Sequence, residues 1–571
     1  MYIWRILLVI TVLLAAYVAA VMAFLVPYLW VVILAVLVVA ACKKGYRYSA
    51  YGTARWAEAA DIPHLLEGGG VILGHIGGKT TKLAGAKALF NSRLSAKKAC
   101  QTFLIACQRK QPSHVVRLTN AVHTAVFAPT GVGKGVSIVI PHLLTCTDSM
   151  VVVDFKGELV KATAHARRGM GQRVVVIDPF GVAGGTDTFN PLDFIDKESR
   201  HALDDCRDLA EALVVRTGQE KEPHWADSAE VWIAAMVATV AAFAGPGDKS
   251  LQSVRSLLTN PVKMQEAIRL MCESDLWEGM LARLGHQLTH FKDKELSSTL
   301  TTTNRFLRFL DTIAISDNTK RSSFDPADLL AGKMTVYLVL PPEHMRAQSP
   351  LLRLWIGSML RAVVKNGLQD HTKVQFVLDE AASLGHMESL DDAVDKFRGY
   401  GIRLLFLYQS LGQLKLCWPE NRDQTLLSNV TQVYFGVNDP QTAEYVSNRL
   451  GDETILVRNW GSNSGSSHQA SPQGGSGTTS YSTGSNESFQ QHGRKLLQPS
   501  EVTALDPRIA VTFAPGVPPM ATWLVRYFEH DFRAERGIGP WKAAFDTACL
   551  FACVVVLAVM VTAAVVSPDF K

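Results

Sequence analysis

Residues 122–140 read V-H-T-A-V-F-A-P-T-G-V-G-K-G-V-S-I-V-I, and this stretch decides the fold. It begins as a β-branched apolar strand, passes into a tight glycine-rich turn, and ends in an apolar segment that can start a helix. Lys134 lies at the junction. In a P-loop this layout lets successive backbone N–H groups and a helix N-terminus point at one anion, with a lysine charge beside them. The chain is therefore predicted to bind ATP or GTP.

The loop departs from the full pattern G-x-x-x-x-G-K-[ST] at two places. Ala128 replaces the first glycine, and Gly135 replaces the hydroxyl residue that would contact Mg²⁺. The alternative interpretation is a glycine-rich strand-to-helix turn that only packs closely. The predicted nucleotide-binding residues are Thr130, Gly131, Val132, Gly133, Lys134, Gly135 and Val136.

A second stretch, residues 374–380, reads V-Q-F-V-L-D-E, a buried-strand pattern that ends in two carboxylates. In P-loop NTPases we expect such a strand beside the P-loop strand, so that its last carboxylate reaches the metal on the nucleotide. Asp379 is predicted to hold Mg²⁺, mainly through water, and Glu380 to polarise the attacking water as a general base. The alternative is an ordinary solvated strand end. The P-loop upstream favours a shared ATP and Mg²⁺ site.

Three further residues follow or flank apolar strand patterns. Gln409 ends the run 402–409, where it is predicted to sense the γ-phosphate or orient water. Arg398, in F-R-G-Y-G, is predicted to act across a subunit boundary on the transition state of phosphoryl transfer. Its alternatives are a surface arginine or a contact to a DNA phosphate. Asp154 ends the run V-V-V-D, and the pattern alone assigns it no role.

Size and composition leave room for two or three domains in 571 residues. A net charge of +5 does not indicate nucleic acid by itself, so any DNA contact would be local. The nine cysteines form no C-x-x-C pair, which supports neither a zinc site nor a disulfide framework. The soluble part is therefore expected to lie in a reducing compartment, the cytoplasm.

Hydrophobic segments at both ends predict membrane anchoring. Residues 6–42 contain no charged side chain. An uncharged stretch of this length is too long for one straight membrane span, so we predict two helices broken near Pro27. A cleaved signal peptide is the alternative, although its apolar core would be shorter. Lys43, Lys44 and Arg47 follow, so the positive-inside rule keeps the N-terminus and the main body in the cytoplasm. Residues 547–566 predict a further span, with a buried core helix as the alternative.

Strand and helix patterns alternate on either side of a long helical region. The predicted organisation is an α/β domain, residues 44–199 and 313–540, with an all-α domain inserted at 200–312 and membrane helices at 1–43 and 547–566. The sheet is expected to be mainly parallel, with ligands at the C-terminal ends of its strands. Residues 461–488 are dominated by Gly, Ser, Thr and Asn, which predicts a flexible loop.

The ordered motifs resemble those of the TraG-type coupling proteins of conjugation and type IV secretion. They run G-T-A-R-W-A at 52–57, A-P-T-G-V-G-K-G-V at 128–136, D-F-K-G-E at 154–158, L-D-E-A-A-S-L-G at 378–385, and R-G-Y-G-I with Y-Q-S after it. The resemblance extends from the N-terminus to about Phe528. Lys134 followed by Gly135 is also similar to family members, whereas the hydrophobic C-terminal segment departs from the commoner soluble tail.

The resemblance implies a RecA-like motor domain with an inserted all-α domain, assembled as a homo-hexamer below an inner-membrane stem. Such a protein would recruit relaxase-bound single-stranded DNA, and often protein effectors, for the inner-membrane components of a type IV secretion channel. Lys134 would contact the β and γ phosphates, while Arg398 and Gln409 match the trans arginine and the glutamine sensor. Two alternatives stay open: a membrane-anchored receptor platform with negligible turnover, and an FtsK-like double-stranded DNA pump. The cargo and the relaxase are not specified by the sequence.

Overall fold

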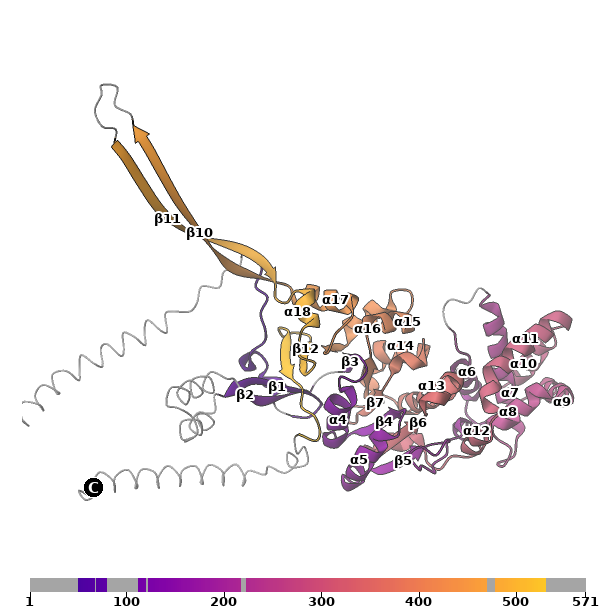
Figure 1. The fold of residues 1–571 in the computed structure, drawn as a ribbon. Coiled ribbons are helices and arrows are strands. Elements are labelled where there is room, and N and C mark those ends of the chain that lie inside the picture. The colour runs from indigo at the N-terminus through magenta and orange to yellow at the C-terminus, as the bar shows by residue number, and fades with distance from the viewer. Residues whose placement is uncertain are drawn as a thin grey trace, which may run out of the picture. The chain divides into compact units, whose positions relative to one another are not determined.

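The computed structural model describes residues 50–66, 68–79, 111–119, 122–216, 222–469 and 478–529. The predicted membrane segments, 1–43 and 547–566, lie outside these described residues. The chain divides into two compact units (Figure 1). The larger contains the described residues of 55–449 and 497–529, and the smaller contains those of 50–54 and 450–496.

The larger unit is built on an 11-stranded mixed sheet in the order β2-β1-β13-β12-β9-β3-β8-β7-β4-β6-β5. The strands from β9 to β5 pair in parallel, and those from β2 to β12 pair antiparallel, as does β12 with β9. The parallel strands are β3 His123–Phe127, β4 Ser149–Asp154, β5 Arg173–Ile177, β6 Met334–Val339, β7 Val374–Leu378, β8 Ile402–Tyr408 and β9 Thr431–Tyr434. The antiparallel strands are β1 Val71–Lys79, β2 Gln111–Leu118, β12 Ile509–Phe513 and β13 Met520–Trp523.

The strand order corrects one expectation about the site. β7 does not lie beside the P-loop strand β3, because β8 pairs with both and separates them. The ends of β3, β8 and β7 still meet at one edge because the three strands are parallel. Continuous apolar runs form these strands because both faces of a parallel sheet are covered, and every residue of β3 is buried.

Helices that connect the parallel strands supply much of the cover. They are α4 Ile140–Thr145, α5 Glu158–Gly169, α13 Pro342–Lys365, α14 Glu388–Asp395, α15 Leu411–Cys417 and α16 Arg422–Asn429. Two more helices lie outside these connections: α17 Pro440–Leu450 follows β9, and α18 Pro499–Thr503 precedes β12. The main core joins sheet residues to the P-loop helix and α5: Val126, Val152 and Val377 from strands cluster with Ile138 and Leu159. The apolar faces of these two helices pack against the sheet, and this packing fixes the position of the loop that precedes each helix.

Between β5 and β6 the described chain forms only helices: α6 Ala202–Leu213, α7 His224–Phe243, α8 Leu251–Thr259, α9 Pro261–Cys272, α10 Met280–Leu288, α11 Asp293–Leu307 and α12 Ile313–Asn318, with short 3₁₀ turns. They gather together in Figure 1. Of the described helices, α7 alone has the length and apolar composition of a membrane span, and 67% of its most apolar stretch is buried inside the protein. It packs against α6, α8, α10 and α11, so it is the central helix of this helical segment.

The smaller unit contains a long antiparallel hairpin, β10 Asp452–Gln469 and β11 Thr478–Lys495. A flexible loop was expected over 461–488, but the structure forms strands over its described parts, 461–469 and 478–488. The loop expectation rested on a composition that cannot bury a core. A ladder of backbone hydrogen bonds needs no core to form, and apolar side chains such as Leu456 and Phe489 flank the polar region.

Candidate functional site

The P-loop begins where β3 ends and depends on glycine at two positions. Gly131 and Gly133 have φ angles of 87° and 103°, values that side-chain-bearing residues rarely adopt. The loop then enters a π-helical turn, Gly135–Val139, which continues as α4. The first backbone N–H groups of a helix have no partner inside it and can bind an anion, although the Ser137 N–H here already donates to the Gly133 carbonyl at 2.9 Å.

Lys134 lies folded against the loop that carries it. Its Nζ donates to the Ala128 carbonyl at 2.6 Å and to the Pro129 carbonyl at 3.4 Å, and the residue is only 8% exposed. Burial lowers the pKa of Lys134, and the charges of Glu380 and Asp379 oppose that shift. The charge of the ammonium is therefore stabilised by these carboxylates and by the two carbonyl oxygens.

The acidic pair follows β7 directly. Burial, and then the charge of Glu380, raise the pKa of Asp379 to about 6, while Lys134 opposes the shift. Glu380 adopts φ 47°, in the left-handed region, before a 3₁₀ turn over Ala381–Leu384. Such strain in a non-glycine residue clusters at functional sites. The turn directs the two carboxylates of one dipeptide toward Lys134 rather than to opposite faces of an extended strand.

Gln409, at the end of β8, holds the Glu380 carboxylate. Its Nε2 donates to Glu380 Oε1 at 3.2 Å and Oε2 at 3.1 Å, and its own backbone N–H donates to Gln413 Oε1 at 2.9 Å. β8 lies between β3, which precedes the P-loop, and β7, which precedes the acidic pair. Gln409 therefore lies between the P-loop and Glu380. This position allows Gln409 to orient Glu380 and any water bound to it.

Asp154 has a structural role. One carboxylate oxygen accepts the Lys156 N–H at 3.1 Å, and the other accepts the Val160 N–H at 2.9 Å. Burial raises its pKa, while these backbone hydrogen bonds favour the charged form. Asp154 therefore anchors the loop after β4 and the start of α5, and it also lines the cavity described next.

Lys134, Asp379 and Glu380 all line one cavity of about 810 Å³ at the C-terminal edge of the parallel strands. Thr130, Gly131, Gly133, Gly135 and Val136 of the predicted loop line it too, while Val132 does not. The lysine and the acidic pair thus converge from strands that are about 250 residues apart in the chain.

Arg398 is not at this cavity. It is exposed in the turn before β8, whereas the P-loop follows β3, so the two lie at opposite edges of the parallel sheet. The Arg403 guanidinium donates to the Arg398 carbonyl at 3.1 Å. Burial, and then the charges of Arg403 and Arg398, lower the pKa of His123, the first residue of β3. A role for Arg398 in its own chain's cavity is therefore excluded by the strand direction.

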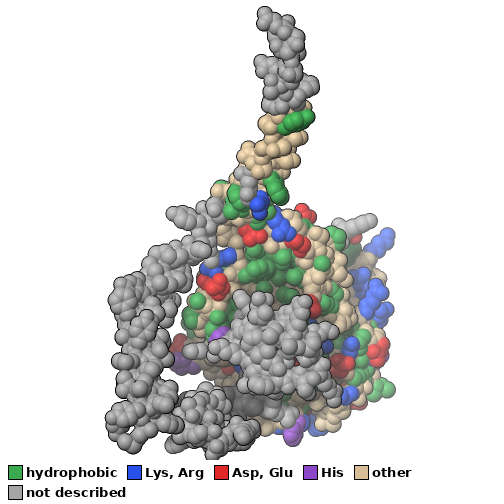
Figure 2. Space-filling model, turned by 60° about the vertical axis from the view of Figure 1, so that its left-hand side comes forward, with side chains coloured by type: hydrophobic (Ala, Val, Ile, Leu, Met, Phe, Trp, Pro, Cys, Tyr) green, Lys and Arg blue, Asp and Glu red, His purple; other side chains and the backbone are tan. Residues whose placement is uncertain are grey.

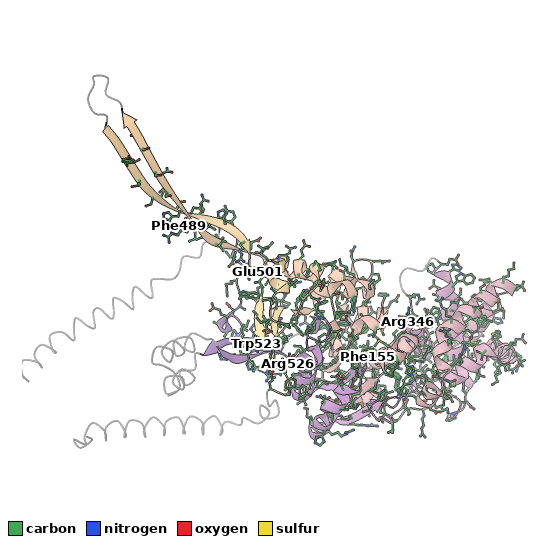
Figure 3. The ribbon with its side chains drawn as sticks, in the orientation of Figure 1. Phe155, Arg346, Phe489, Glu501, Trp523 and Arg526 are labelled. Carbon is green, nitrogen blue, oxygen red and sulfur yellow. The ribbon has the colours of Figure 1, made fainter. Side chains whose placement is uncertain are left out.

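The cavity includes side chains that sequence patterns did not indicate. Phe155 follows β4, Met345 belongs to α13, and Arg526 and Phe528 come from the segment after β13. Figure 3 shows Phe155 and Arg526 on these two separate elements. The backbone N–H of Tyr527 donates to the Val136 carbonyl at 3.0 Å and ties the late segment to the P-loop helix. No local signal could have found a contact between residues nearly 400 positions apart.

The donor set fits Mg²⁺ bound largely through a nucleotide. No group of three or more His, Cys, Asp and Glu side chains that could cage a metal occurs in the described part of the chain. Mg²⁺ keeps several waters and usually takes only one or two carboxylates beside substrate phosphates. Asp379, partly exposed in the cavity and with its charge poorly stabilised, is the carboxylate suited to such an ion.

The ionised Asp379 carboxylate destabilises the folded chain, so we predict that Asp379→Asn increases the stability. The pKa of about 6 in the folded chain exceeds the ordinary 3.8, so folding favours the protonated form. Protonation of Asp379 therefore adds to the free energy of unfolding fully below pH 3.8, and this contribution is lost as the pH rises through 6. For this partly exposed group the contribution is roughly 1–3 kcal/mol. We therefore expect the unfolding temperature of Asp379→Asn to exceed that of the parent at pH 8.

The measurement is thermal unfolding of the full chain in detergent at pH 4, 6 and 8, without nucleotide. The advantage of Asp379→Asn should shrink toward pH 4, where the parent carboxyl is protonated. An equal advantage at all three pH values would contradict the electrostatic cause.

Comparison with known protein families decides the identity of the chain. The family described as type IV secretory system conjugative DNA transfer matches residues 57–548. The chain belongs to the type IV coupling proteins of the TraG/VirD4 family. The match spans both halves of the sheet and the helical segment between them.

Curated coupling proteins from several bacteria are similar to the chain along most of its length. VirD4 of Rhizobium radiobacter is 28% identical over 489 residues, which is 84% of this chain and 64% of the relative. TraG of the same species is 27% identical over 421 residues, covering 72% and 62%. VirD4 of Bartonella quintana is 28% identical over 400 residues, covering 67% and 59%. The coupling protein described here thus spans 59–64% of the length of these relatives.

Solved structures confirm the α/β part of the expected fold. The conjugative coupling protein TrwBΔN70 with sulphate superimposes with a TM-score of 0.54 at 19% identity, covering 72% of this chain and 88% of that one. TrwB in complex with ADP and Mg²⁺ gives 0.53 at 18% identity, with the same coverage. The shared fold is the RecA-like α/β arrangement that was expected, with a mixed sheet.

Proposed function

We propose that the chain is an inner-membrane, ATP-driven coupling protein that recruits relaxase-bound single-stranded DNA and delivers it to a type IV secretion channel. Protein effectors are a second class of cargo under the same proposal. The observation that carries it is the convergence of Lys134, Asp379 and Glu380 on one cavity in a chain of the conjugative DNA-transfer family. TrwB, which has the same fold, has been solved with ADP and Mg²⁺.

The proposed site works through positioning and charge. The backbone of the P-loop would surround the phosphates, and Lys134 would move from its carbonyl contacts to the β and γ phosphates. Asp379 would hold Mg²⁺ mainly through water, and the bound ion would neutralise phosphate charge. Glu380, oriented by Gln409, would accept a proton from the attacking water.

Arg398 is proposed to complete the site of a neighbouring copy. Its exposure, at the edge of the sheet opposite the cavity, leaves it accessible to another chain. An arginine supplied in trans stabilises the charge of phosphoryl transfer and makes turnover depend on assembly. We propose a closed ring of six copies, in which every site would receive such an arginine from its neighbour.

The proposed location follows from segments outside the described residues. Residues 6–42 and 547–566 are long enough to span a bilayer, and Lys43, Lys44 and Arg47 favour a cytoplasmic main body. The inserted helical segment would then face incoming cargo as a separate all-α domain.

A turnover assay with DNA tests the function. ATP hydrolysis by the full chain in detergent should rise when single-stranded DNA is added. The stimulation should fall steeply with salt, because phosphate contacts release counterions. Measurable turnover that DNA does not change would contradict the motor, and negligible turnover under all conditions would favour the receptor platform.

The late segment predicts a nucleotide-base contact at Phe528. Phosphates held by N–H groups up to Val136 would leave the ribose and base beyond it, where Tyr527 bonds the Val136 carbonyl. Phe528 is 62% exposed there and lines the cavity with Arg526. Phe528→Ala should weaken ATP binding roughly 5–150-fold, because a base–aromatic stack contributes about 1–3 kcal/mol.

Inorganic tripolyphosphate, which has no base, separates this contact from the phosphate site. Its affinity, measured by competition with a fluorescent nucleotide, should be the same in Phe528→Ala and the parent. Phe528→Tyr is the matched variant and should bind ATP normally. Equal losses for ATP and tripolyphosphate would mean that the segment supports the loop and does not contact a base.

A further inference from the structure

Arg398 lies on a turn whose backbone is fixed to the neighbouring strand. The turn is the 3₁₀ segment Phe397–Tyr400, which ends at Gly401 just before β8. The Gly401 N–H donates to the Arg398 carbonyl at 3.3 Å, and the Gly401 carbonyl accepts the Val374 N–H of β7 at 3.0 Å. Gly401 has a φ of 81°, and a Cβ there would lie 2.3 Å from the Thr372 carbonyl oxygen. Only glycine fits this position, so the turn is held in one place.

Arg403, the second residue of β8, adds a side-chain hydrogen bond to the same turn. Its Nη1 donates to the Arg398 carbonyl at 3.1 Å and to the Ile402 carbonyl at 2.8 Å. Of the side chains that the structure describes, Arg403 alone is hydrogen-bonded to the backbone of Arg398. A carbonyl oxygen has two lone pairs, and here Gly401 and Arg403 occupy both. The backbone at Arg398 is therefore held more firmly than a single 3₁₀ turn would hold it.

The charges of Arg398 and Arg403 repel each other. Burial, and then the charge of Arg398, lower the pKa of the partly buried Arg403, and the charge of Asp148 opposes the shift. A shift with this cause means that the two guanidinium groups lie near enough to interact. The Arg398 side chain is therefore disfavoured from folding back along β8, and the repulsion directs it away from its own strand.

The Arg398 guanidinium forms no ion pair within the described part of the chain. Arg398 is exposed, and none of the ion pairs between described residues includes it. Lys396, two positions earlier, pairs with Asp392 at 2.6 Å. Figure 2 likewise shows several exposed Lys and Arg side chains beside Asp or Glu. A cation on a rigid turn, without such a partner among the described residues, is suited to an anion that another chain brings.

We propose that Arg403 is a positioning residue for Arg398: it fixes the turn through the Arg398 carbonyl and keeps the Arg398 guanidinium directed toward the nucleotide of a neighbouring copy. This role of Arg403 rests on the trans role proposed above for Arg398. Arg403 lies near the start of β8, whereas the cavity lies beyond the end of that strand, and Arg403 is not among the residues that line it. Its loss should therefore affect the neighbour's site and leave the cavity of its own chain intact.

Arg403→Met tests this role on a single kind of chain. Methionine keeps an unbranched apolar side chain but removes the charge and both hydrogen bonds. ATP turnover of the full chain in detergent should fall about 100-fold, the loss typical of misplacing a group by about 1 Å, while the affinity for a fluorescent nucleotide stays unchanged. Arg168→Met removes an exposed arginine of α5 and is the matched control. Loss of nucleotide affinity in step with turnover would overturn the proposal, because it would place the damage in the chain's own sheet.

Two mixtures of co-expressed chains decide on which side of the subunit boundary Arg403 acts. Mixed with Lys134→Ala, Arg403→Met should regain turnover, because its intact lysine meets the other chain's intact turn at roughly a quarter of the boundaries. Mixed with Arg398→Ala, it should regain none, because every turn in the ring is then defective. A role of Arg403 inside its own chain predicts the reverse pattern. Either departure, no recovery with Lys134→Ala or recovery with Arg398→Ala, would overturn the proposal.

The mixture of Lys134→Ala with Arg398→Ala separates failure of this role from failure of the trans arginine itself. Recovery in it, with either departure in the Arg403 mixtures, overturns the role of Arg403 alone. No recovery in it, while two tags show a mixed oligomer, overturns the trans arginine and the role of Arg403 together. Arg403→Gln, whose amide is too short to reach the Arg398 carbonyl, passes through the same mixtures in case Arg403→Met does not assemble. Parental turnover in either variant would also overturn the proposal.

Discussion

Lys134→Ala should lower ATP turnover by about 100- to 1,000-fold, the loss typical for removing one preorganised charge from a transition state. Nζ is held at the Ala128 carbonyl in the loop that lines the cavity, so the ammonium would leave this contact to reach the phosphates. Phosphate release by the full chain in detergent measures the effect. Lys161→Ala removes an exposed lysine of α5 and serves as the matched control. Parental turnover in Lys134→Ala would remove the catalytic assignment of the whole cavity.

A mixture of inactive chains extends this result to Arg398. Lys134→Ala and Arg398→Ala should each be inactive alone. When they are co-expressed, a site regains both groups wherever an intact lysine meets a neighbour's intact arginine, which random mixing in a ring gives at roughly a quarter of the boundaries. Recovery of activity in the mixture would identify an arginine acting between chains. Without recovery, in a mixed oligomer verified by two tags, the trans role fails.

Glu380→Gln should abolish turnover while ATP binding persists. The substitution keeps the size of the side chain and removes the base, and loss of general-base catalysis costs about 100- to 10,000-fold. Gln409 now donates to both carboxylate oxygens, so the new amide must rotate to offer its single oxygen. We therefore expect a fall in kcat with a change of less than a few-fold in nucleotide affinity.

The two quantities are separated by measuring turnover and fluorescent-nucleotide binding on the same preparation. Glu444→Gln, an isosteric change at an exposed residue of α17, controls for the loss of one negative charge. Weakened binding in step with turnover would mean that Glu380 supports the metal or the loop and does not act on water.

The local patterns of the parallel strands were readable because each pattern describes one element. β3, β7 and β8 appear in the sequence as apolar runs, and their last residues, followed by Lys134, Asp379 and Gln409, identify the catalytic edge. The order of the strands was not readable, since β8 is inserted between β3 and β7 by long-range packing. The hairpin was missed for a related reason: its composition indicates that it has no core, and pairing between its strands does not require one.

By itself the sequence determined the chemistry at the strand ends, because a glycine turn, a lysine and a carboxylate pair act through residue type and spacing. Only the tertiary structure decided that Gln409 holds Glu380, that Arg398 lies away from its own cavity, and that Arg526 and Phe528 enter it. These placements arise when segments hundreds of residues apart pack into one sheet. No local pattern encodes such contacts, since they depend on the summed packing of the whole core.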